Sequence, residues 1–187
     1  MSAHQKIKYL LIDIYESWSY LILTGLAASI TFFKVFLYAQ VLTASEFSNL
    51  NYFYTYVFIF LLLLGVGVIN RSHVEFADKV LSGATVNELN KFSSQFKVNI
   101  LFHSLVALMF SFLVSKLVPI ENFGYLIYAI IFSTLFLWFL VDIILLKSHG
   151  MFSEYGKKLL ARNIFIFLFG VSAYYYTGQV GMVVMSE

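Results

Sequence analysis

The stretch Val57-Phe58-Ile59-Phe60-Leu61-Leu62-Leu63-Leu64 decides the fold class of this chain. Its unbroken apolar character does not match the alternating pattern of a lipid-facing barrel strand. It lies inside a longer apolar segment that approaches the ~20 residues a helix needs to cross a bilayer. A helix also satisfies its backbone hydrogen bonds internally, as the hydrocarbon core requires. The stretch therefore predicts a transmembrane helix.

Four other segments carry the same signal, so we expect an all-α, polytopic transmembrane helical bundle forming one domain over residues 1–187. Composition agrees, because 60% of the residues are apolar and only 12% are charged, against roughly 45–50% and 25% in soluble domains. The net charge of +2 does not suggest a nucleic-acid partner, and the lack of cysteine excludes thiolate metal sites. The predicted spans are 18–41, 52–69, 98–118, 123–146 and 163–176.

Residues 1–17 precede the first span and have an amphipathic pattern. Their apolar residues recur at helical spacing up to the start of the span, namely Ile7, Leu10, Leu11, Ile14 and Trp18. We expect an amphipathic helix lying in the membrane interface. An ordinary beginning of the first span is the alternative.

The basic residues predict the orientation. Ten of the twelve Lys and Arg lie in the N-terminal segment, in residues 70–97 and in residues 147–162. Because basic residues concentrate on the cytoplasmic side, the N-terminus and the loop 70–96 should be cytoplasmic. Within that loop, Ser82-Gly83 predicts a break, and Thr85 and Glu88 have the spacing of a capping box that starts a helix. Pro119 should lie in a short outer turn.

The C-terminal stretch 178–185 is still apolar. It resembles a turn followed by the first residues of a sixth span. We therefore expect the chain to be incomplete.

Three ionisable residues are candidates for binding a substrate in a cavity. Lys34 lies inside the first span, and it either extends to the membrane surface or faces a cavity where it attracts an anionic group. Arg71 can pair with Glu75 one helical turn away, or form a gate contact at the cytoplasmic end of the second span. The remaining candidate is Asp142.

Asp142 lies about one turn from the inner end of the fourth span. Pairing with Lys147 or another cytoplasmic base is the simpler interpretation, and substrate binding is the alternative. Asn99 and His103, one turn apart in the third span, favour interhelical hydrogen bonding over a proton relay.

Motifs of known enzyme classes are missing from the sequence. We find no Gly-x-Ser-x-Gly elbow, no His-Glu-x-x-His and no phosphate-binding glycine loop. The four histidines have no metal-ligand spacing. We therefore expect neither enzymatic activity nor a cofactor.

Two motifs connect the first two spans to a known family. Phe33-Lys34-Val35-Phe36-Leu37-Tyr38-Ala39-Gln40 leads into Val41-Leu42-Thr43-Ala44-Ser45-Glu46-Phe47, and the second span ends in Leu64-Gly65-Val66-Gly67-Val68-Ile69-Asn70-Arg71. This order resembles the N-terminal part of the O-antigen and capsule polysaccharide flippases of the multidrug/oligosaccharidyl-lipid/polysaccharide exporter superfamily. Ser48 stands where that family usually has glycine.

The resemblance implies the incomplete N-terminal lobe of a two-lobe exporter in the bacterial inner membrane. Such exporters move a lipid-diphosphate-linked oligosaccharide to the outer leaflet for lipopolysaccharide or capsule assembly, and Lys34 would compensate the diphosphate. Implied partners are membrane lipid, the lipid-linked oligosaccharide, and a polysaccharide polymerase or glycosyltransferases. Two alternatives remain open: another exporter of the same superfamily, and a non-transporting scaffold in an envelope complex.

Overall fold

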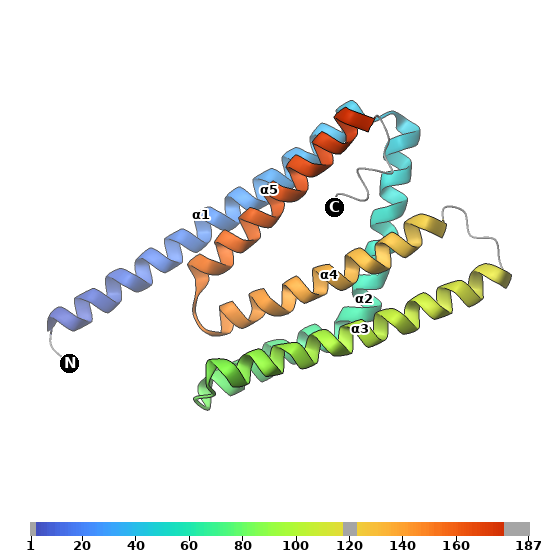
Figure 1. Ribbon diagram of the computed structural model, residues 1–187. Coiled ribbons are helices and arrows are strands. Elements are labelled where there is room, and N and C mark those ends of the chain that lie inside the picture. Colours follow the sequence, from blue (N-terminus) through green and yellow to red (C-terminus); the bar gives the residue numbers. More distant parts are fainter. Residues whose placement is uncertain (1–2, 118–122, 178–187) are drawn as a thin grey trace.

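The computed structural model describes residues 3–117 and 123–177, and all five elements in that part of the chain are helices. In chain order they are α1 (Ala3–Val41), α2 (Ala44–Leu81), α3 (Val86–Leu117), α4 (Phe123–Ser148) and α5 (Phe152–Thr177) (Figure 1). All five are long and apolar enough to cross a membrane. The prediction of an all-α bundle is confirmed, and the chain is a multi-pass membrane protein.

The helices extend well beyond the predicted spans. α2 begins at Ala44 rather than 52 and continues to Leu81, and α5 begins at Phe152 rather than 163. The predicted connection 70–96 is therefore helical except for residues 82–85. The helix after Thr85 was expected, whereas the continuation of α2 to Leu81 was not. Polar residues interrupt the hydropathy signal without interrupting the i to i−4 hydrogen bonds. The cytoplasmic location of this segment stays a prediction.

Both tight turns before α2 and α3 use the same cap. The backbone N–H of Thr85 donates to Glu88 Oε2 at 2.7 Å, and Glu88 N donates back to Thr85 Oγ1 at 3.4 Å. This confirms the predicted capping box. Thr43 and Glu46 form a second one, with matching distances of 2.8 and 3.3 Å. Gly83 adopts a left-handed φ of 79° between α2 and α3, which fits the predicted break because glycine tolerates that conformation.

Two of the predicted features lie outside the described residues, namely the turn at Pro119 and the sixth span beginning in 178–185. The N-terminal segment belongs to α1, which runs without a break from Ala3 to Val41. At ~1.5 Å per residue this helix is about 58 Å long, far more than the ~30 Å hydrocarbon thickness. The location of residues 1–17 in the membrane interface stays a prediction.

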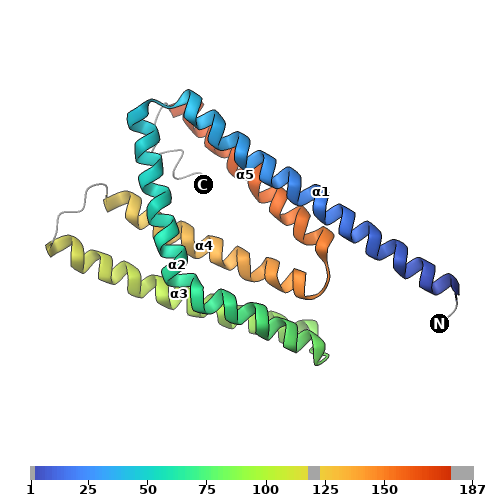
Figure 2. The same ribbon diagram turned by 180° about the vertical axis from the view of Figure 1, so that it is seen from behind.

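α1 and α5 form a closely packed pair and lie side by side in both views (Figures 1 and 2). Gly156 makes the close approach possible, because a Cβ built there would lie 2.8 Å from Leu23 Cβ. At the start of α5, the backbone N–H of Ser153 donates to Glu16 Oε2 of α1 at 2.7 Å. A carboxylate at a helix N-terminus satisfies an otherwise unpaired donor and is favoured by the helix dipole.

α2, α3 and α4 form the second group, with α4 at its centre. Gly65 of α2 packs against Leu137 of α4, whose Cδ2 would lie 2.6 Å from an added Cβ. The Thr134 hydroxyl of α4 donates to Ser104 Oγ of α3 at 2.7 Å. Such interhelical hydrogen bonds and close glycine contacts are the usual means of helix association in lipid. The buried core residues of this group include Leu50, Phe53, Phe76, Leu89, Ile100, Ile130 and Val141.

Candidate anion-binding cavity between α1, α4 and α5

Lys34 is buried, with only 8% of its surface exposed, although it lies inside an apolar span. Its Nζ lies 5.8 Å from the ring centroid of Tyr54, a residue of α2, so α2 also lies next to the Lys34 side chain. Lys34 lines a cavity of about 140 Å³ between α1, α4 and α5. The structure therefore matches the predicted cavity-facing placement, rather than a side chain extended along the surface. The residues around the cavity are Ile30, Thr31, Lys34, Phe132, Phe136, Arg162, Asn163 and Ile166.

Arg162 contributes a second cation to this cavity. Its guanidinium carbon lies 4.8 and 5.0 Å from the ring centroids of Phe136 and Phe139. Arginine stacks on aromatic rings in this way and keeps a planar set of donors. From sequence, Arg162 was grouped with the basic residues outside the fifth span. Because α5 starts at Phe152, Arg162 instead lies ten residues, or about 15 Å, into the helix.

Asn163 fixes the orientation of Arg162. The buried side-chain amide donates through Nδ2 to the carbonyl of Ala27 at 2.9 Å and to Thr31 Oγ1 at 3.0 Å. Its Oδ1 accepts from Arg162 Nε at 3.1 Å and Nη2 at 2.8 Å. The amide thus connects the backbone of α1 to the guanidinium of α5. A functional group held by a satisfied hydrogen-bond network is preorganised for its ligand.

The charge and size of the cavity limit what it can bind. None of its eight lining residues is acidic, and two are cationic. Cationic side chains at such a site within a span attract an anionic group. A volume of 140 Å³ is well below the about 300–1,000 Å³ of sites that enclose a whole small molecule. The cavity therefore suits one anionic group of a larger ligand, such as a phosphate.

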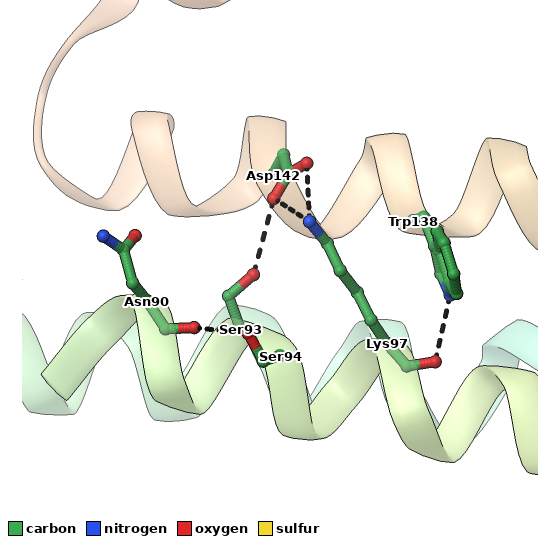
Figure 3. A network of polar contacts seen from close by, with 6 residues as sticks. All are labelled: Asn90, Ser93, Ser94, Lys97, Trp138 and Asp142. Atoms are coloured by element: carbon green, nitrogen blue, oxygen red, sulfur yellow. Dashed lines mark hydrogen bonds and ion pairs between the residues drawn. The ribbon is translucent and has the colours of Figure 1, made fainter. Parts of the chain in front are cut away.

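Asp142 lies elsewhere, in the contact between α3 and α4 (Figure 3). Its carboxylate accepts from Lys97 Nζ, with distances of 2.6 Å to Oδ1 and 2.8 Å to Oδ2. Ser93 Oγ donates to it at 3.4 Å, and Trp138 Nε1 donates to the carbonyl of Lys97 at 3.0 Å. The expected pairing with a basic residue is thus made by Lys97, not by Lys147.

We expect Asp142→Asn to destabilise the bundle while leaving ligand binding in the cavity unchanged. Both side chains of the ion pair are partly exposed, at 28% for Lys97 and 41% for Asp142, so the loss should be only about 1 kcal/mol. Thermal unfolding in detergent measures it. The double variant Lys97→Gln/Asp142→Asn should recover part of the loss. A selective loss of ligand affinity without loss of stability would instead place Asp142 in the binding site.

Arg71 lies in neither of these two sites. Together with Asn99 and His103, it lines a groove between α2 and α3. It forms the predicted ion pair with Glu75, one turn along α2. The three candidate residues Lys34, Arg71 and Asp142 are therefore not brought together. Among the described residues, no group of three His, Asp or Glu side chains is placed to hold a metal ion.

Arg162 and Asn163 are the site residues that sequence reasoning missed. One sequence feature could have identified them: the two residues form an Arg-Asn pair directly before the apolar run that starts at Ile164. Comparison with known proteins gives no significant match to any family model, curated protein or solved structure.

Proposed function

We propose that this chain contributes the N-terminal lobe of an inner-membrane transporter that flips a lipid-diphosphate-linked oligosaccharide for surface polysaccharide assembly. The observation that supports it is the cavity shared by Lys34 and Arg162. Two cations in a small buried space suit a diphosphate, whose charge must be compensated on its way through the hydrocarbon core. The sequence resemblance supplies the substrate class.

The two cations have different roles in this proposal. Lys34 acts as a flexible point charge, whereas Arg162 presents a planar donor group held by Asn163, Phe136 and Phe139. The cavity holds only part of the diphosphate group. The glycan and the hydrocarbon chain remain outside it. A scaffold without transport would have no use for a buried lysine and a partly buried arginine at one cavity, which makes the scaffold hypothesis the weaker one.

The test is transbilayer movement in proteoliposomes that contain the purified full-length protein. The substrate is a fluorescent polyprenyl-diphosphate oligosaccharide, and a membrane-impermeant reductant reports how much of it lies in the outer leaflet. We expect nearly all of the probe to become accessible, against about half in protein-free vesicles. Movement of a cationic drug but not of the diphosphate would indicate another exporter. If neither probe moves faster than in protein-free vesicles, the transport proposal is wrong.

A further inference from the structure

An apolar groove runs along α2 and α3, away from the Lys34 cavity. One section has a volume of about 520 Å³, and it continues through the shared residues Leu63, Leu64 and His103 into a second section of about 310 Å³. The first section is almost entirely apolar, and the second ends at Arg71 and Asn99. The groove is therefore amphiphilic along its length, with Arg71 and Asn99 at one end, His103 where the two sections meet and Ser111 on the wall of the apolar section.

Gly67 keeps the groove open near its polar end. It lines the second section, and a Cβ built there would meet no atom within 4 Å. By contrast, Gly65, two residues earlier, packs directly against Leu137 of α4. The space beside Gly67 is thus not filled by the described helices.

The position of Arg71 indicates what occupies the groove. Arg71 follows the apolar part of α2 directly, because that part continues through Val68 and Ile69 before the polar pair Asn70-Arg71. This position is close to the level of lipid headgroups, which extend about 5–8 Å beyond the hydrocarbon core. From Arg71 to Ile59 the groove covers about 18 Å of helix, close to the ~15 Å of one leaflet.

The donors at this end suit a phosphate. The Arg71 guanidinium donates through Nε to Glu75, and in the described part of the chain its terminal nitrogens have no protein acceptor. Arginine uses such a free edge to bind phosphate oxygens. Asn99 and His103 are exposed on the wall of the groove, where exposure to hydrocarbon would be costly. A phosphate headgroup beside them would satisfy these donors.

We propose that this groove binds one anionic phospholipid, with one acyl chain along α2 and α3 and the phosphate at Arg71. The inference is independent of the flippase proposal, because it concerns a resident membrane lipid and different residues. A structural lipid here would fill the seam between α2 and α3.

The test uses native mass spectrometry of the purified full-length protein, with phosphatidylglycerol and phosphatidylcholine as competing probes. We expect one phosphatidylglycerol to be retained. Gly67→Leu, which fills the groove, should lower its occupancy by roughly tenfold, and Ala107→Phe, on the α3 wall, should do the same. Arg71→Gln should remove the preference for phosphatidylglycerol. Gly25→Leu is the matched control, since a Cβ there also meets no atom within 4 Å, and it should retain the lipid.

A photoactivatable phosphatidylglycerol locates the bound lipid, and its crosslinks should lie on peptides containing residues 59–71 and 99–114. Equal retention by wild type and both filling variants would overturn the proposal. So would equal loss in Gly25→Leu. In a separate experiment with a bifunctional crosslinking reagent, crosslinks between these peptides of two protein chains would also overturn it, because they would indicate that a helix of a second copy covers the groove.

Discussion

Replacing Lys34 with Met should reduce transport of the lipid-diphosphate probe by about 10–100-fold without lowering the amount of folded protein. The substitution keeps a long side chain in the cavity and removes the ammonium group, with its charge and its hydrogen-bond donors. Hydrogen bonds to charged groups contribute roughly 1.5–3 kcal/mol, and each 1.4 kcal/mol corresponds to about tenfold. Initial rates in the proteoliposome assay, normalised to protein content, measure the effect.

Two controls separate charge in the cavity from charge in general. Lys34→Arg should keep most of the transport, since it keeps the cation. Lys116→Met removes an exposed lysine from the last turn of α3, which does not line the cavity, and it should leave the rate unchanged. If Lys34→Met transports as well as wild type, Lys34 has no part in the mechanism.

Gly156→Ala should disturb the structure more than a methyl group added at Gly65 or Gly25. The new Cβ would lie 2.8 Å from Leu23 Cβ, an atom fixed to the backbone of α1, so the two helices must separate. Overpacking costs about 1–3 kcal/mol, and it opposes a gain of about 1 kcal/mol from replacing glycine in a helix. We expect a net loss, seen as a melting temperature lowered by several degrees.

Two other glycines serve as comparisons for Gly156. Gly65→Ala meets Leu137 Cδ2, the end of a flexible side chain, and should be less damaging. Gly25→Ala meets nothing within 4 Å and should be neutral or slightly stabilising. Because the hydrogen bonds of Asn163 to α1 depend on the same helix pair, Gly156→Ala should also weaken ligand binding. Equal melting temperatures for all three variants would mean that the close approach of α1 and α5 is unimportant.

The sequence was sufficient to predict those structural features that depend on residues close together in the chain. The apolar run at 57–64 predicted its helix, and the spacing of Thr85 and Glu88 predicted their capping box. Helix ends were harder to predict. Hydropathy falls at polar residues such as Lys157, whereas α5 continues through them because its backbone hydrogen bonds are unaffected.

The sequence was insufficient where residues distant along the chain meet. Asp142 was expected to pair with Lys147 or another cytoplasmic base, and the sequence did not decide which. Lys147 lies five residues further along the same helix, a rotation of about 140° away from Asp142. Lys97 of α3 lies opposite Asp142 instead. Likewise, Arg162 enters the cavity only because Gly156 and Leu23 bring α5 against α1. Nothing in the local sequence around Arg162 specifies that contact.

Binding of farnesyl diphosphate, with farnesol as its neutral counterpart, tests the central claim most directly. Calorimetry on the purified full-length protein, with phosphatidylglycerol present to occupy the α2–α3 groove, should show that wild type prefers the diphosphate, and that Lys34→Met/Arg162→Gln binds diphosphate and alcohol equally. Arg71→Gln, altered in the α2–α3 groove, should keep the preference. If the double variant still prefers the diphosphate as wild type does, the cavity of Lys34 and Arg162 is not the anion site.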